Sequence, residues 1–233
     1  MFTDAQLNQA MEIVSVLDIP MEFGSYEGDG GAACEMIRDQ IDISGLDIGE
    51  YDVASGISKA VIVPHDLPYV IKIPFHGQFC GDWDEDDHYQ YDFWFFEDAC
   101  AEAPADYCRD ELEKIDLMNH FGFGQLTVET RWLCEVDGQD FYIQEKVKCG
   151  RSNFKSSAQS EETARSMERN YRIGPIEWLA NVIEYFGESL WRQFVDWNLS
   201  EEEHYLIDDL HCGNVGLTYD GRPIMFDVSG FRD

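Results

Sequence analysis

The sequence predicts an α+β protein with a β-rich first lobe and a mainly helical second lobe. Short runs rich in β-branched residues recur between residues 51 and 147, and Asp137-Gly138 joins two of them as a hairpin. A polar stretch, 148–160, separates these runs from a helical region, 161–197. A second hairpin signal follows at Asp220-Gly221. We expect a first lobe at 51–147, a second lobe at 148–233 and an N-terminal extension at 1–50.

Composition limits the classes of function. The chain has 233 residues, 44% of them hydrophobic, enough for one large domain or two apposed lobes. The formal net charge of −31 argues against a nucleic-acid surface and against anionic membranes, and it attracts basic partners. Seven scattered cysteines without a CxxC pair indicate neither disulfides nor a zinc ribbon. With no signal peptide and no membrane span in the sequence, we expect a cytoplasmic protein.

The N-terminal extension begins with a capping signal. Thr3 and Gln6 have the spacing of a capping box, which predicts a helix over 4–16. One face of this helix would be apolar and packed on the main body, formed by Leu7, Met11, Val14 and Leu17. Residues 21–50 are rich in glycine and acids, and we expect a loop with a short helix.

The first lobe should contain three antiparallel strands, then a helix and a hairpin. The three strands carry Val53, Val61 to Val63, and Val70 to Ile73, and the helix covers 106–120. The hairpin strands are expected at 130–136 and 141–147. Between strands and helix lies an acidic, aromatic-rich insertion, 78–104, which we interpret as a solvated loop or a partner-binding surface, with its aromatics packed on the body.

The second lobe should be helical until its final hairpin. Gly174-Pro175 predicts an interruption in the helical run, and three tryptophans at near-helical intervals are expected in the core. These tryptophans are Trp178, Trp191 and Trp197. Strands at 215–218 and 223–228 would flank Asp220-Gly221.

Three polar residues near the end of the chain form the most specific motif. Asn214 follows Asp209 by five residues, and Asp227 follows Asn214 by thirteen. This is the order of a phosphotransfer site, in which one acid meets the acceptor hydroxyl while an amide and a second acid hold magnesium. Chance supplies many acids in so acidic a chain. It does not readily supply the string Asp-Leu-His-x-Gly-Asn-x-Gly, a tight turn and an Asp at the end of an apolar strand.

The order of the expected elements is the layout of a protein-kinase-like fold. Lys72, on the third strand, would meet the nucleotide phosphates, although a lone lysine on an edge strand more often points to solvent. Its expected partner is a carboxylate on helix 106–120, where Glu111 and Glu113 are both available. We favour Glu111, because it would lie beside an apolar stripe through Ile115 and Met118.

Nucleotide contacts are expected at two further places. Ser55, Gly56 and Ser58 occupy the turn where a phosphate-covering loop would lie, although an ordinary hairpin turn explains that segment equally well. Glu145 and Val147, before the polar connector, would offer backbone groups to adenine. Any residue could make such main-chain contacts, so only the position of this segment in the chain supports the expectation.

The motif strings also resemble a known family. Residues 209–216, Asp-Leu-His-Cys-Gly-Asn-Val-Gly, with Ile-Met-Phe-Asp-Val-Ser at 224–229, resemble the early serine/threonine protein kinases of T-seven-type phages and related small phage kinase-like proteins. The resemblance implies that Asp209 is the catalytic base, that Asn214 and Asp227 bind Mg²⁺, and that Lys72 binds ATP. Ile207 stands where protein kinases have histidine, and Ser229 where they have glycine. The second lobe would be minimal, ending soon after Asp227.

The sequence therefore predicts a phage-type kinase that transfers the γ-phosphoryl group of Mg-ATP to serine or threonine of host proteins in the host cytoplasm. The first alternative is an inactive kinase-like protein that docks its acidic surface on a basic host factor. The second is a small-molecule phosphotransferase, suggested by His211 and Gly213. The oligomeric state and the target stay open.

Overall fold

The computed structural model describes most of the chain as two compact units. The described residues are 1–17, 26–27, 50–55, 59–74, 77–83, 89–95, 107–136, 138–171, 174–199, 207 and 210–228. Unit 1 comprises Met1–Arg109 and Glu129–Lys146, and unit 2 comprises Asp110–Val128 and Val147–Asp233. Unit 2 thus takes in most of the helix that we had assigned to the first lobe. Each unit is described separately below.

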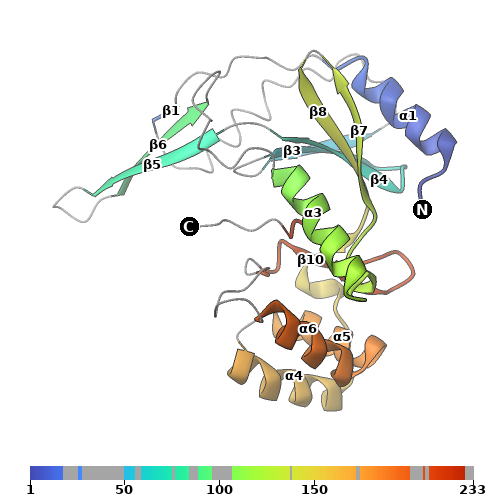
Figure 1. Cartoon of the computed structure of the whole chain (residues 1–233), viewed down its shortest axis with the longest axis vertical. Coiled ribbons are helices and arrows are strands. Elements are labelled where there is room, and N and C mark those ends of the chain that lie inside the picture. Colours follow the sequence, from blue (N-terminus) through green and yellow to red (C-terminus); the bar gives the residue numbers. More distant parts are fainter. Residues whose placement is uncertain are drawn as a thin grey trace. The chain divides into compact units, whose positions relative to one another are not determined.

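Unit 1 contains a five-stranded antiparallel sheet of order β2-β3-β4-β8-β7 (Figure 1). The three expected strands are present as β2 (Tyr51–Ser55), β3 (Lys59–Pro64) and β4 (Tyr69–Pro74). The expected hairpin is formed by β7 (Thr130–Val136) and β8 (Gln139–Glu145). Gly138 has a φ of 83°, which glycine adopts without strain in the turn between them.

One face of this sheet is covered by α1 (Asp4–Val14), which lies beside β7 and β8 in Figure 1. The capping box is confirmed, because Thr3 N–H donates to Gln6 Oε1 at 2.8 Å and Gln6 N–H to Thr3 Oγ1 at 3.3 Å. The predicted apolar face was wrong at Met11, which is 39% exposed. The buried stripe is rotated onto Ala10, Ile13 and Val14, which follow the same i, i+3, i+4 spacing.

The core of unit 1 lies between α1 and the sheet. Alternate residues of the central strands point into it, as expected for a sheet with one covered face. Its largest members include Ile62, Ile71 and Ile143, all 0% exposed, and Tyr69. Phe141 and Leu133 extend the same cluster toward the edge of the sheet.

A second sheet in unit 1 has the order β1-β6-β5. Its strands are β1 (Tyr26–Glu27), β5 (Gly77–Trp83) and β6 (Tyr89–Phe95), and β5 pairs with β6 from Gly77 opposite Phe95 to Trp83 opposite Tyr89. The interpretation of the insertion 78–104 as a solvated loop was therefore wrong for 78–83 and 89–95. Residues 89, 91, 93 and 95 are aromatic at period two, which favours a strand. The packing of these side chains lies outside the described residues.

Unit 2 is built on helices around one apolar core. They are α3 (Tyr107–His120), from Asp110 onward, and α4 (Ala158–Tyr171), α5 (Ile176–Phe186) and α6 (Glu188–Asn198), with short 3₁₀ turns at Gly124–Leu126 and Arg151–Asn153. Figure 1 shows α4, α5 and α6 gathered together. Trp178 and Trp191 are buried in the core as predicted, and the Phe194 ring lies tilted against Trp191 with 5.0 Å between the ring centroids. Trp197 is only partly buried.

The helical region is interrupted twice. Gly174, with φ 79°, and Pro175 lie between α4 and α5, as predicted. A second break at Gly187 was not predicted. Its φ of 88° closes α5 and opens α6, so a single residue separates the two helices.

The last hairpin of unit 2 joins a short third strand. β10 (Val215–Leu217) and β11 (Pro223–Met225) pair antiparallel, and β10 also pairs with β9 (Lys148–Cys149). The second strand is shorter than predicted, so Asp227 lies two residues beyond its end. Residues 148–149, which we expected only as a polar connector, are thus part of this sheet.

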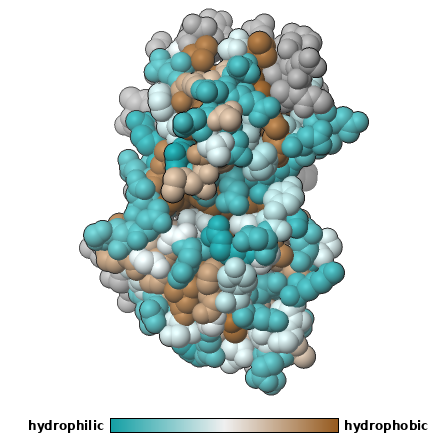
Figure 2. Space-filling view, turned by 90° about the vertical axis from the view of Figure 1, so that its right-hand side faces the viewer, coloured by the Kyte–Doolittle hydropathy of each residue, from teal (hydrophilic) through white to brown (hydrophobic). Residues whose placement is uncertain are grey.

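The described surface mixes polar and apolar side chains. Figure 2 shows one face on which hydrophilic residues, in teal, are interspersed with hydrophobic residues in brown. Exposed aromatic residues among those described include Phe121, Trp132, Tyr185 and Tyr219. None of the described helices is long and apolar enough to cross a membrane.

Candidate functional site

Helix α3 presents a buried carboxylate to unit 2. Its buried positions, Cys108, Glu111, Ile115 and Met118, are spaced by three, four and three residues, so they form one helical stripe. Glu111 lies on this stripe, not beside it as predicted, and it is 0% exposed. Glu113, the alternative acid, is exposed. Of the two acids that the sequence left open, Glu111 is therefore the buried one.

The loop before β10 is a compact turn. The backbone N–H of Asn214 donates to the His211 carbonyl at 3.0 Å, and the N–H of Gly213 donates to His211 Nδ1 at 2.9 Å. A Cβ at Gly213 would lie 2.7 Å from His211 Cε1. Because such an approach is too close, only glycine lets the imidazole fold back onto this backbone. His211 thus orders the loop.

The hairpin register brings the two predicted metal ligands, Asn214 and Asp227, to neighbouring positions. Val215 pairs with Met225, and the N–H of Phe226 donates to the Asn214 carbonyl at 2.9 Å, so the ladder continues one step past the strands. Asn214 therefore lies across from Phe226, the residue before Asp227. A separation of thirteen residues in sequence becomes adjacency across a hairpin. Asn214 is 7% exposed.

Asp227 has an unusual backbone conformation that Glu111 supports. Its φ of 55° lies in the left-handed region, and it is the one non-glycine residue with positive φ among those described. This conformation is uncommon for residues with a Cβ, although Asp and Asn tolerate it best. The N–H of Asp227 donates to Glu111 Oε1 at 2.7 Å. A buried carboxylate thus holds the backbone of a strained residue in place, which is typical of functional sites.

The turn of the hairpin is fastened to the rest of unit 2 by polar contacts. Arg222 donates from its guanidinium to the carbonyls of Gln125, at 2.7 Å, and Thr127, at 3.0 Å. The Arg222 N–H donates to Thr218 Oγ1 at 2.9 Å, and the Thr218 hydroxyl donates to Asp220. That hydroxyl lowers the pKa of Asp220 below its usual value. These contacts fix the hairpin from the end opposite Asp227.

In unit 1, Lys72 is a buried lysine in the middle of the sheet. It is 2% exposed and lies on β4, opposite Val61 on β3 and Tyr142 on β8. Because β4 is the central strand, the interpretation as a solvent-facing edge lysine was wrong. Lys72 has an interaction partner, as expected for a buried cation.

A second buried lysine was missed by the sequence reasoning. Lys59 is 7% exposed and pairs with Pro74, two residues beyond Lys72 along β4, so the two lysines share the face of the sheet opposite α1. Lys59 follows a polar turn in the sequence, and such a position is usually solvated. Lys59 and Val61 are two residues apart on one strand and therefore face the same side of the sheet, which is the only sequence signal for the orientation of Lys59.

The segment expected to contact adenine is held by backbone bonds within unit 1. Glu145 pairs with Tyr69, and its N–H donates to the Glu129 carbonyl at 2.9 Å. The Lys146 N–H donates to the Pro68 carbonyl at 2.9 Å. Val147 is the first residue of the second segment of unit 2. Glu145 is therefore a fixed strand end, and the division into units falls just after it.

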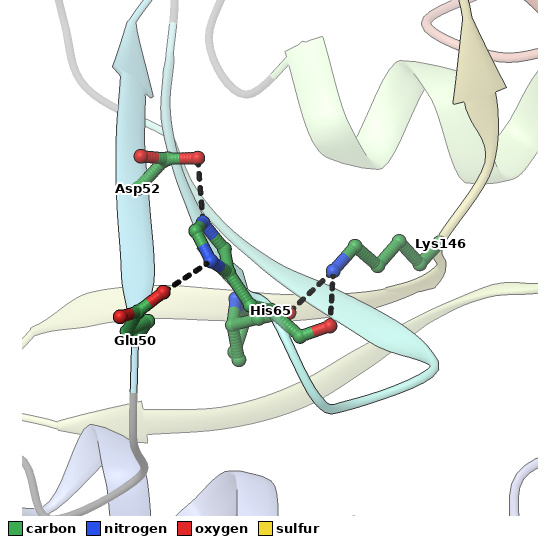
Figure 3. Close-up of polar contacts among 5 residues, drawn as sticks. Glu50, Asp52, His65 and Lys146 are labelled. Carbon is green, nitrogen blue, oxygen red and sulfur yellow. Dashed lines mark hydrogen bonds and ion pairs between the residues drawn. The ribbon is translucent and has the colours of Figure 1, made fainter.

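A polar cluster connects the β3–β4 turn to β2 and to the residue that follows β8 (Figure 3). Lys146 Nζ donates to the carbonyls of Pro64, at 2.5 Å, and His65, at 3.0 Å. His65 Nε2 is 2.8 Å from Asp52 Oδ2, and His65 Nδ1 is 3.5 Å from Glu50 Oε2. The hydrogen bond to Asp52 is the main cause that raises the pKa of His65, and Glu50 adds to it.

Four predicted site residues are described partly or not at all. Asp209, Gly56 and Ser58 lie outside the described residues. Ser55 is the last residue of β2 and pairs with Ala60, and its side chain lies outside the description.

The donor chemistry near the hairpin fits a hard cation. Asn214 offers an amide oxygen and Asp227 a carboxylate, which are the ligand types that Mg²⁺ prefers. Among the described residues, no group of three or more His, Cys, Asp or Glu side chains is placed to hold a metal ion. The two predicted ligands, Asn214 and Asp227, together supply one amide oxygen and one carboxylate.

Comparison with known proteins gives no independent assignment. No protein-family model, curated protein or solved structure matched this chain. The functional inference therefore rests on the residues and contacts described above.

Proposed function

We propose that this chain is a protein-kinase-like phosphotransferase of the phage type. In this proposal unit 1 and unit 2 correspond to the two lobes of a minimal kinase-like fold. The enzyme transfers the γ-phosphoryl group of Mg-ATP to serine or threonine hydroxyls of host proteins. It acts in the host cytoplasm.

The observation that carries the proposal is the support of Asp227 by Glu111. A buried carboxylate accepts the backbone N–H of an Asp in the left-handed conformation, and Asn214 lies next to it across the hairpin. A merely structural turn would more readily place glycine, which has no Cβ, at the left-handed position. An aspartate kept there at a conformational cost is explained if its carboxylate has a ligand to hold.

The proposed roles follow the chemistry of each side chain. Asn214 and Asp227 would hold Mg²⁺, which supplies charge neutralisation on the nucleotide phosphates. Lys72 would bind phosphate oxygens, and Glu111 keeps Asp227 in place. The acceptor oxygen forms a bond to the γ-phosphorus while the bond from that phosphorus to the bridging oxygen breaks. ADP leaves, and the hydroxyl proton passes to the Asp209 carboxylate.

The direct test is transfer of labelled phosphate from Mg-ATP to proteins in a bacterial lysate. We expect labelling by the parent and a loss of about a hundredfold or more in Asp209→Ala, which should still bind nucleotide. Asp227→Ala should lose metal-dependent nucleotide binding as well, seen as a lost thermal shift. Asp116→Ala removes an exposed acid of α3 and serves as the control. Equal labelling by the parent and Asp209→Ala would rule out the proposed role of Asp209.

The second candidate is an inactive kinase-like protein that docks on a basic host factor. The net charge of −31 favours it, because so strong a field attracts cationic surfaces. It predicts a nucleotide-independent complex that weakens steeply as salt rises from about 0.05 to 0.5 M. A parent protein that forms such a complex and transfers no phosphate would favour this candidate over the first.

A further inference from the structure

The end of α6 carries a buried side chain that holds a distant part of the backbone. Asn198 is the last residue of α6 and is 0% exposed. Its amide Nδ2 donates to the Ile207 carbonyl at 2.9 Å, and the Ile207 N–H donates to Asn198 Oδ1 at 2.8 Å. One amide therefore satisfies both backbone groups of one residue, nine positions further along the chain.

This pair of bonds is not a helix cap. The C-cap of α6 is Leu199, whose N–H bonds to Val195 and Trp197 within the helix. The Asn198 side chain instead points away from its own helix end to Ile207. Because Asn198 and Ile207 are both at most 1% exposed, neither backbone group of Ile207 could turn to water if the amide were removed.

Ile207 lies two residues before Asp209 in the sequence, and it belongs to an apolar core. The Ile207 side chain is 1% exposed and belongs to the core of unit 2, and Leu210, on the other side of Asp209, belongs to the same core. The backbone is thus held at Ile207 by Asn198 and the core. It is held again from Leu210 to Asn214, by the core and by the turn at His211.

We propose that Asn198, by holding the backbone of Ile207, is a positioning residue for the proposed phosphoryl transfer, an inference that rests on the proposed function. The resemblance to protein kinases leads one to expect a histidine at position 207, and this chain has isoleucine there. Asn198, at the end of α6, takes over this role by bonding to the backbone of Ile207, so no side chain at position 207 is needed. Transfer of a proton to Asp209 needs the carboxylate held within a fraction of an ångström, so loss of this anchor reduces turnover.

The test compares Asn198→Ala with Val195→Ala. Val195 is 0% exposed on the same helix, so its truncation weakens the same core without touching Ile207. Both variants are assayed at a temperature at which both are folded. Hydrogen exchange of the Ile207 amide is measured in parallel. We expect Asn198→Ala to lower kcat about ten- to a hundredfold with KM for Mg-ATP changed less than about threefold. Val195→Ala should keep most of the parent kcat.

The outcomes separate this inference from the proposed function. Faster exchange at Ile207 together with a selective loss of kcat in Asn198→Ala supports the positioning role. If the parent is active and the two variants have equal kcat, the positioning role is overturned and the proposed function stands. If the parent transfers no phosphate, the proposed function is overturned, and the positioning role with it.

Discussion

The five-stranded sheet of unit 1 and the β10–β11 hairpin of unit 2 are both antiparallel, yet different forces hold them. The sheet has strands of five to seven residues and buries Ile62, Ile71 and Ile143 against α1. The hairpin has strands of three residues and depends on side chains that bond to backbone, chiefly Arg222 and Glu111.

The difference indicates that the sheet mainly provides stability, whereas the hairpin mainly fixes the geometry of the site. Apolar burial is roughly proportional to area and has no direction, so the sheet should tolerate exchanges of similar volume. Hydrogen bonds to a buried carboxylate and from a guanidinium group are directional, so the hairpin holds particular atoms at particular positions. We therefore expect changes in the sheet to alter stability most and changes in the hairpin to alter the site most.

The largest expected effect on stability is in the sheet. Ile71→Ala removes a side chain that is 0% exposed on the central strand, and it should reduce the free energy of unfolding by about 2–5 kcal/mol. Urea denaturation followed by fluorescence measures this loss. Ile71→Val, which keeps most of the volume, should cost about 0.5–1.5 kcal/mol. Equal losses in the two variants would contradict the claim that burial in this sheet sets the stability.

The next effect concerns the contact that supports Asp227. Glu111→Ala leaves the partly buried Asp227 N–H without its acceptor, and we expect a loss of about 1–3 kcal/mol together with strongly reduced phosphate transfer. Glu111→Gln keeps an acceptor oxygen and should retain more of the stability. Denaturation and transfer assays on both variants check this. If Glu111→Ala proves as stable as the parent, the bond to Asp227 contributes little.

A smaller effect is expected at the loop before β10. In Gly213→Ala the new Cβ would displace the His211 ring and break the bond from the Gly213 N–H to Nδ1, at a cost of about 0.5–1.5 kcal/mol. A double-mutant cycle with His211→Ala tests the reason, because the added methyl should cost much less once the ring is gone. The same cost in both backgrounds would show that the clash with His211 is not the cause.

The smallest effect is a dependence of stability on pH. Folding raises the pKa of His65 above 6.5, mainly through Asp52, so protonated His65 stabilises the folded state below that value. This contribution is lost as pH rises through the folded pKa. The difference in urea midpoint between the parent and His65→Asn should therefore be larger at about pH 5.5 than at about pH 8.5. Asp52→Asn should reduce this dependence on pH. A difference in urea midpoint that is the same at both pH values would contradict the prediction.

The sequence predicted most elements of this fold because local patterns specified them. The capping box at Thr3, the turn at Gly138 and the interruption at Gly174 each depend on residues close in the chain. The break at Gly187 was missed, because one glycine in a strongly helical run is a weak signal. The strands β5 and β6 were not predicted, because the many acidic residues in this segment suggested a solvated loop and outweighed the aromatic residues at period two.

The site was predicted less completely. The spacing of Asn214 and Asp227 indicated a shared hairpin, and the register bears this out. No local pattern could show that Glu111 is buried and bonds to Asp227, 116 positions further along the chain. The pairing of Asn198 with Ile207 was equally hidden, since asparagine at a helix end usually suggests a cap.

By itself the sequence determined which segments become helices and strands and which polar residues stand at suggestive intervals, because propensity, periodicity and turn chemistry act over a few residues. Only the tertiary structure decided which acid faces inward, that Lys72 is buried on a central strand, and that Asp227 adopts a left-handed conformation. These outcomes depend on packing between elements distant in the chain, where burial makes each unpaired polar group costly and leaves few arrangements allowed.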